Sequence, residues 1–243
     1  MSVQLSEHPS DYLSKPFLLV TKRLILVPTP IAIGYDQYVQ LYGSLHASEA
    51  FCQMAFGPHF LARELNVEGT RNVILTRDLE RCWKKRGLGD FAVGLRTRRD
   101  GSDAMRSDSG RRLEGDESVN IVEDFDLDIL SGVEWVGYAG VRDATTTSMP
   151  DWEEGDEPLP PWKEMVELRY GVHEKVWGKG VAGDAAKAVM QWAVAERGVK
   201  RFIAETEKTN VRSGKVLQKM GFRESGTNYW KEPSETEWEK VTD

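Results

Sequence analysis

The sequence predicts a mixed α/β fold, in which strands and helices share one sheet without a regular alternation. Three observations support this prediction. Apolar segments with strand character are interspersed with segments of helical periodicity, and no internal repeat is apparent. A turn with three glycines joins a strand-like segment at 163–172 to a helical segment. With 243 residues, the chain fits either one large domain with insertions or two domains.

The N-terminal half supplies the first elements of this fold. Residues 1–16 are polar and mixed in charge, which predicts a loose arm. Residues 17–28 have two apolar stretches around a polar centre and end at a proline, which predicts one strand. A helix is expected at 29–44, and apolar residues at helical spacing predict a second helix at 66–86. A strand at 90–98 follows the glycines that end this helix.

Two segments between these elements and the C-terminal half are expected to be irregular. Ten of the nineteen residues from 99 to 117 are charged, so this part buries too little apolar surface to offset its ordering entropy. We expect a charged, mobile insertion at about 99–131. An acidic, proline-rich loop is expected at 145–162. The prediction is thus an arm at 1–16 and a single domain at 17–243 that carries both segments.

Strands and helices alternate more clearly in the C-terminal half. We expect strands at 132–144 and 163–172, a helix from the glycine turn to about residue 197, a strand at 200–207, a short helix that Gly221 closes, and one or two strands in the tail.

Composition and charge exclude several functions. The net charge of −7 argues against a nucleic-acid surface, and no apolar run approaches the roughly 18 residues that span a membrane. Cys52 and Cys82 are too few for a disulfide framework. The histidines form no metal-ligand pattern, so we expect no metal. These features predict a cytoplasmic protein, either a monomer or a homodimer.

The glycine turn has the properties of an anion site. The first turn of a helix leaves backbone N–H groups without intrahelical acceptors, and the peptide dipoles add partial positive charge there. Gly178, Gly180 and Gly183 would let a phosphate approach this backbone, and Lys179 could add a charged contact. The turn lacks the Lys-Ser or Lys-Thr of a Walker motif, and the Rossmann fold's alternating units are missing. A structural helix cap is the alternative.

Two motifs carry a resemblance to a known family. The segment "VELRYGVHEKVWGKGVAGDAAKAVMQWAV" and the later "NVRSGKVLQKMGF" resemble the acetyl-CoA-binding core of the GNAT N-acyltransferase superfamily. The likeness is greatest to the branch that includes the ribosomal-protein N-terminal acetyltransferases, and it covers roughly residues 163–222. It implies a central mixed, mostly antiparallel sheet of about seven strands, splayed at the fourth and fifth strands and flanked by helices.

The resemblance also implies a coenzyme A site. The backbone of Tyr170, Gly171 and Val172 would pair with the pantetheine arm, and Asn210 and Ser213 would contact the cofactor from the other side. For Asn210 a helix N-cap is the alternative, and both roles can coexist. The pyrophosphate would be held by the loop and the first helical turn, at Trp177, Gly178, Lys179, Gly180, Val181, Ala182 and Gly183.

The resemblance implies catalytic carboxylates as well. Acetyl transfer needs a neutral amine, so a base must remove a proton from the ammonium. Glu167 is favoured as this base over Glu205, and an exposed strand carboxylate is the alternative for each. A backbone N–H near Tyr170 would polarise the thioester carbonyl. Leu217 stands where some relatives place a tyrosine acid, so the proton donor to the thiolate is unassigned.

Together these features predict an acetyl-CoA-dependent N-acetyltransferase. A primary amine, in a small molecule, a protein N-terminus or a lysine, would attack the thioester directly in a ternary complex. The acidic residues at 151–157 would attract this amine by their negative charge, and a solvated acidic loop is the alternative. Two alternatives are a non-catalytic acyl-CoA-binding module and an interaction scaffold that uses the charged insertion.

Overall fold

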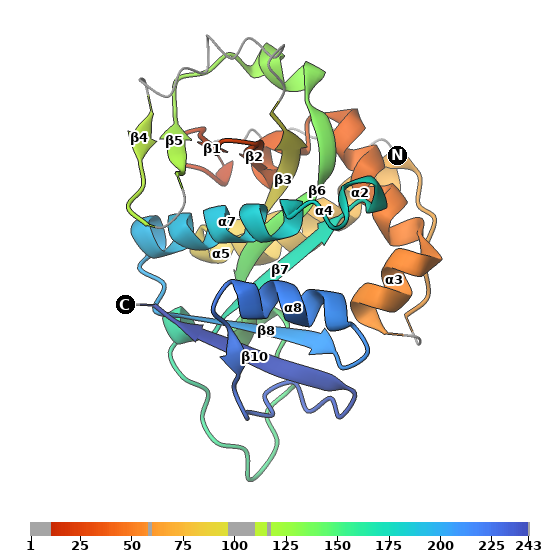
Figure 1. Cartoon of the computed structure of the whole chain (residues 1–243), viewed down its shortest axis with the longest axis vertical. Coiled ribbons are helices and arrows are strands. Elements are labelled where there is room, and N and C mark those ends of the chain that lie inside the picture. Colours follow the sequence, from red (N-terminus) through yellow and green to blue (C-terminus); the bar gives the residue numbers. More distant parts are fainter. Residues whose placement is uncertain (1–10, 58–59, 97–109, 116–117, 243) are drawn as a thin grey trace.

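A computed structural model describes residues 11–57, 60–96, 110–115 and 118–242. They form one ten-stranded sheet with helices on both faces (Figure 1). The sheet order is β4-β5-β1-β2-β3-β6-β7-β8-β10-β9, and every neighbouring pair is antiparallel except β7 and β8. The strands are β1 (Leu18–Val20), β2 (Leu24–Pro28), β3 (Asp90–Leu95), β4 (Arg111–Arg112), β5 (Asn120–Val122), β6 (Glu134–Asp143), β7 (Val166–Val172), β8 (Arg201–Glu207), β9 (Arg223–Glu224) and β10 (Glu235–Val241).

The helices cover the sheet in two layers. In Figure 1, α7 and α8 lie in front of the sheet, whereas α4 and α5 lie behind it. The helical elements are α1 (Thr29–Ala32), α2 (Asp36–Ala47), α3 (Glu49–Phe56), α4 (Val67–Ile74), the π-helix η2 (Leu75–Trp83), α5 (Lys84–Arg86), η3 (Leu127–Gly132), α6 (Ala144–Thr147), η4 (Trp162–Glu164), η5 (Glu174–Val176), α7 (Val181–Arg197) and α8 (Val211–Lys219). The predicted mixed, mostly antiparallel fold class is confirmed, with more strands than the seven expected.

The N-terminal segment forms two strands, and the prediction of one strand at 17–28 is wrong. Its polar centre makes a tight turn, in which the hydroxyl of Thr21 accepts the backbone N–H groups of Arg23 and Leu24. β1 and β2 therefore pair as a hairpin. Residues 1–10 of the expected arm lie outside the described residues. The end of the arm packs on the core, where Tyr12 is buried and donates to Glu80 at 2.8 Å.

The described part of the expected insertion contributes two strands to the sheet. β5 pairs with β1, and β4 pairs with β5. Val119, Ile121 and Val122 are buried in the main core, so apolar burial fixes this stretch despite the charged residues before it. The expected mobility therefore does not apply to these residues. Residues 97–109 and 116–117 lie outside the described part of the chain.

The functional region depends on the separation of β7 and β8. These parallel strands are in register only at Val166–Phe202 and Glu167–Ile203. β7 remains paired with β6 up to Val172, so beyond Glu167 only its side toward β8 is left open. This is the predicted splay. Side chains of β7 alternate between the two faces of the sheet, which places Tyr170 toward α8 and Glu167 and Arg169 toward the opposite face.

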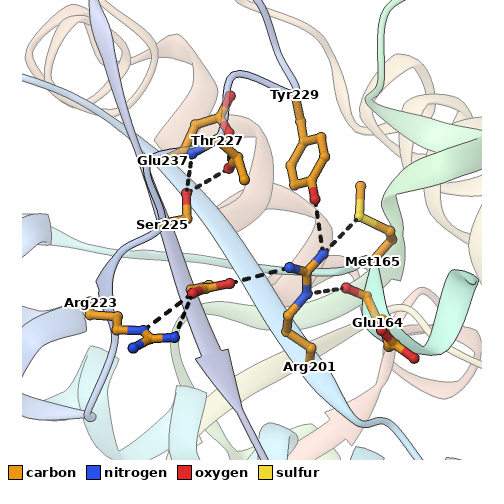
Figure 2. Close-up of polar contacts among 9 residues, drawn as sticks. Glu164, Met165, Arg201, Arg223, Ser225, Thr227, Tyr229 and Glu237 are labelled. Atoms are coloured by element: carbon orange, nitrogen blue, oxygen red, sulfur yellow. Dashed lines mark hydrogen bonds and ion pairs between the residues drawn. The ribbon is translucent and has the colours of Figure 1, made fainter. Parts of the chain in front are cut away.

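At the other end of β8, a polar cluster joins the last strands (Figure 2). The guanidinium of Arg201 donates to the carbonyl of Glu164 at 2.7 Å, to the hydroxyl of Tyr229 at 3.2 Å and to the carboxylate of Glu239 at 3.2 Å. Glu239 also accepts from Arg223 at 3.0 Å. The carboxylate of Glu239 is thus held by two guanidinium groups.

Candidate active site

One cavity of about 1220 Å³ connects both faces of the sheet. On one side it is lined by the glycine turn, the start of α7 and the first turns of α8. On the other side it is lined by α2, α3, α4 and charged residues of β6, β7 and β8. Because the open part of the β7–β8 splay lies between these two linings, a ligand on the α7 side can meet a ligand on the α2 side through the sheet.

The predicted glycine turn lines this cavity. Gly178 and Gly180 have φ angles of 73° and 77°, which are left-handed conformations that favour glycine. Gly180 is the N-cap of α7 and supplies no side chain, so the N–H groups of Val181, Ala182 and Gly183 face the cavity end of the helix without intrahelical acceptors. A Cβ atom on Gly178 would point into open space. The turn therefore offers an uncovered row of backbone donors.

Arg23 holds this turn in place from the β1–β2 hairpin. Its guanidinium donates to the carbonyl of Lys179 at 2.9 Å and forms an ion pair with Asp184 in the first turn of α7. No local pattern in the sequence indicates this role of Arg23, because the hairpin and the glycine turn are far apart in the chain. The indole of Trp177 donates to the carbonyl of Val172 at 2.7 Å, which fixes the other end of the turn.

Tyr170 of β7 contacts α8 beside the opening between β7 and β8. The hydroxyl of Tyr170 lies 2.7 Å from the hydroxyl of Ser213. Burial raises the pKa of Tyr170 to about 12, so the phenol stays protonated at neutral pH. Asn210 accepts the N–H of Ser213 and donates to the carbonyl of Met54 at 2.7 Å, so its side chain is an N-cap that also ties α8 to α3.

The open side of β7 also lines the cavity, at Tyr170, Gly171 and Val172. Gly171 is required by close packing, since a Cβ atom there would lie 2.7 Å from the ring of Phe51 and 2.8 Å from that of Tyr138. The backbone of β7 therefore approaches the aromatic side of the cavity closely.

Glu167 lies in the cavity wall but is fully engaged. It is buried, and its two carboxylate oxygens accept from Arg142 at 2.9 and 2.6 Å. The hydroxyl of Ser148 donates to the same carboxylate. Burial acts to raise the pKa of Glu167, but Arg142 and Ser148 outweigh it and the pKa is lowered. The geometry therefore favours a fixed ionised partner for Arg142 rather than a group that takes up protons.

Glu205 has the opposite environment. Its carboxyl lies in the cavity wall together with that of Glu235 from the start of β10. In the described part of the chain, no lysine or arginine lies within ion-pair distance of either carboxyl. Burial raises the pKa of Glu205, and Glu235 and Glu167 raise it further. Glu205 therefore holds a proton much more strongly than an exposed glutamate does.

Aromatic side chains from α2, α3 and β6 line the far part of the cavity. The ring of His46 stacks on Tyr42 at 4.4 Å and lies 5.9 Å from Tyr138 and 6.0 Å from Phe56. Its Nδ1 is 2.9 Å from the carbonyl of Tyr42, and burial lowers the pKa of His46, so the ring is neutral at neutral pH. This aromatic wall was not among the predicted site residues, although the aromatic residues at helical spacing in 38–56 are a signal for it.

Other predicted features lie outside this arrangement. Among the described residues of the cavity lining there are none from the acidic segment 151–157, in which Glu153 and Asp156 form ion pairs with Lys231. Cys52 and Cys82 are buried thiols. Within the described ranges, no three His, Cys, Asp or Glu side chains are grouped to hold a metal ion. A helix that could cross a membrane is also absent from them.

The comparisons with known proteins agree with this geometry. The sequence profile of the family described as "Acetyltransferase (GNAT) domain" matches residues 120–223, which include β6, the glycine turn and α8. By sequence, no curated protein matches the chain.

Several solved structures share the fold. An acetyltransferase from Agrobacterium tumefaciens is 19% identical, with a TM-score of 0.56 over 95% of this chain and 97% of that chain. RimL, a ribosomal L7/L12 α-N-protein acetyltransferase in complex with coenzyme A, is 13% identical, with a TM-score of 0.52 over 92% and 97%. The aminoglycoside acetyltransferase AAC(6')-Ib, in complex with coenzyme A, is 10% identical, with a TM-score of 0.51 over 93% and 94%. At these identities the likeness shows the fold alone.

The GNAT acetyltransferase family profile thus matches residues 120–223, and the remaining described residues complete a sheet with flanking helices like those of the solved acetyltransferases. This match agrees with the resemblance that the sequence motifs carry.

Proposed function

We propose that this protein transfers an acetyl group from acetyl-CoA to a primary amine by direct attack in a ternary complex. The observation that carries the proposal is the continuous cavity through the β7–β8 splay. It joins a row of backbone donors on the α7 side to a chamber on the α2 side that contains Glu205. Two substrates that enter from opposite faces would therefore meet between the two strands.

The residues on the α7 side fit coenzyme A. Bound acetyl-CoA supplies an acetyl group that is activated as a thioester. The uncovered N–H groups of Val181, Ala182 and Gly183 suit its pyrophosphate, and the open space at Gly178 leaves room for it. The open backbone of β7 at residues 170–172 suits an extended arm that pairs like an added strand. A backbone N–H near Tyr170 would then donate to the thioester oxygen.

We assign the removal of the amine proton to Glu205 rather than to Glu167. A base must gain a proton during the reaction, and Glu167 would have to give up its ion pair with Arg142 to do so. Glu205 has no such partner in the described structure and has a raised pKa, which makes it the stronger base. Asn210 and Ser213 then act mainly by holding α8 and Tyr170 beside the splay.

The acceptor chamber favours an amine attached to an apolar or ring-shaped group. Tyr42, His46, Phe56 and Tyr138 offer ring faces, and the carboxyls of Glu205 and Glu235 offer negative charge for the ammonium. RimL is named for a ribosomal-protein acceptor and AAC(6')-Ib for an aminoglycoside acceptor. These two acceptors differ in size, so the likeness supports a primary amine but does not indicate the molecule that carries it.

Calorimetry with coenzyme A tests the α7 side of this proposal. Gly178→Ala should weaken binding about tenfold or more, because a methyl group would enter the space meant for the pyrophosphate. Gly226→Ala is a matched control, since Gly226 has a similar φ of 70° and open space at its Cβ but lies outside the cavity lining. Equal effects of the two substitutions, or no binding by the wild-type protein, would contradict the proposal.

An acetylation assay over a panel of primary amines tests the reaction itself. We expect acetylated product with wild-type protein and a large loss with Glu205→Gln at unchanged coenzyme A affinity. Coenzyme A binding without any transfer would instead indicate a non-catalytic acyl-CoA-binding module.

A further inference from the structure

We propose that Glu235 is a positioning residue for the acetyl transfer, because its carboxyl shares one proton with Glu205 in the wall of the cavity. This inference rests on the proposed function, and it assigns a role to a residue of β10 that lies outside the segment matched by the family profile.

The register of β8 and β10 places the two carboxyls together. Glu205 lies opposite Glu237, and Glu207 lies opposite Glu235, so Glu205 and Glu235 are diagonal neighbours on one face of the ladder. Both residues line the cavity. The oxygen Oε2 of Glu235 is inaccessible to solvent and has no hydrogen-bond partner in the described structure.

A shared proton explains this unpaired oxygen. A buried acceptor without a donor costs free energy, and two ionised carboxylates side by side repel each other. One proton between them turns one carboxyl into a donor and leaves a single negative charge on the pair. Burial of Glu205, its contact with Glu235 and the nearby charge of Glu167 all favour the protonated form.

The charges around the pair leave this proton in place. Glu167 is the other carboxylate that faces Glu205, and it adds negative charge. Arg142 is the cation whose charge acts on Glu205, but its Nε and Nη2 both donate to Glu167. The ammonium of an acceptor would be the first cation to contact the pair directly.

The shared proton gives Glu205 the base strength that the reaction needs. When the pair loses its proton, the two neighbouring negative charges hold the next proton strongly, and Glu205 can take it from the acceptor nitrogen. The nitrogen then forms its bond to the carbonyl carbon as the C–S bond breaks. An ammonium loses two protons in becoming an amide. One is matched by the proton that the thiolate gains, and the other reaches solvent.

The pH dependence of kcat/KM for a single acceptor tests this role. Glu235→Gln removes the neighbouring charge, so the pKa of Glu205 should fall. The low-pH limb of the profile should then move to lower pH by about one unit or more, and the plateau should fall because the base is weaker. Glu237→Gln is the matched control. Glu237 lies on the same face of β10, but its carboxylate accepts from Trp230 and Thr227 outside the cavity lining. The same limb in both variants and in the wild type would overturn the proposal.

Infrared difference spectroscopy tests the shared proton without any reaction. Asp78 is another buried carboxyl with a raised pKa, so a carboxylic-acid carbonyl band is expected in all the proteins. At neutral pH the difference spectra of wild type minus Glu205→Gln and of wild type minus Glu235→Gln should show an additional carbonyl band of this kind, which is absent from the difference of wild type minus Glu237→Gln. A difference spectrum of wild type minus Glu235→Gln without this band would overturn the inference even if acetyl transfer is demonstrated. If the band behaves as expected in a protein without transferase activity, the proposed function fails and the proton pair stands.

Discussion

The two ends of the β8–β10 ladder differ in whether their charged side chains have partners of opposite charge. At one end, Arg201 and Arg223, which are labelled in Figure 2, both donate to the carboxylate of Glu239. At the other end, Glu205 and Glu235 place two carboxyls in a cavity wall, and no cation of the described chain contacts them. The same two strands thus carry a cluster that stabilises the fold and a pair that costs stability. We take the second as the mark of the reactive site.

The largest expected effect is a loss of activity when Glu205 is replaced at the cavity end of the ladder. Glu205→Gln cannot accept a proton, so kcat should fall about 10²- to 10⁴-fold, the usual contribution of a general base. Steady-state acetylation kinetics measure this loss. Glu207→Gln on the same face of β8 is the control. A larger loss in Glu167→Gln, in a variant that stays folded, would return the role of base to Glu167.

A smaller effect, on stability, is expected at the end of the ladder where Glu239 is paired with Arg201 and Arg223. Glu239→Gln removes the carboxylate between Arg201 and Arg223, so the free energy of unfolding should fall by about 2 kcal/mol. Denaturant unfolding measures this change, and Glu224→Gln on the exposed strand β9 is the control. If the loss does not exceed that of the control, the cluster is not a stabilising contact.

The pH dependence of stability sharpens the comparison. Folding raises the pKa of Glu205, so above about pH 4.3 the unfolded chain releases a proton that the folded protein keeps. The wild-type free energy of unfolding should therefore fall as pH rises, by at most about 1.4 kcal/mol per pH unit. Glu205→Gln should lack this contribution. Unfolding of both proteins between pH 5 and pH 8 should show the variant gaining relative stability, and parallel curves would contradict this expectation.

The smallest effect is expected when a cation is introduced at the cavity end of the ladder, so that its charges are paired like those around Glu239. Glu235→Lys places a cation beside Glu205, which should raise the free energy of unfolding by about 0.5–1 kcal/mol at pH 8. Thermal unfolding measures this gain. Glu237→Lys, which loses the contacts to Trp230 and Thr227, should be destabilised instead.

Local patterns made most of the fold predictable from the sequence. The helix at 181–197, the glycine turn and the helix at 211–219 follow from periodicity and cap residues within one segment. The split of residues 17–28 into two strands was missed because a three-residue polar centre fits either an interrupted strand or a turn. The strands at 111–112 and 120–122 were missed because β5 pairs with β1, which lies about 100 residues away, and β4 forms only by pairing with β5.

The candidate site was only partly predictable, for the same reason. Glu167 and Glu205, the two catalytic carboxylates that the resemblance implies, both line the cavity, but their opposite states depend on Arg142, Ser148 and Glu235. These partners come from other strands and loops, and no spacing in the sequence indicates them. Arg23 is a further example, because it holds the glycine turn from a hairpin about 160 residues earlier.

The outermost strands of the sheet have a consequence for the behaviour of the whole protein. β4 and β9 contain two exposed residues each, and all four are charged: Arg111, Arg112, Arg223 and Glu224. Such borders are too short and too polar to template a strand from another molecule. The edges of the sheet can therefore be exposed to solvent without pairing with strands of other molecules. Concentrated solutions of this protein should accordingly resist aggregation through strand addition.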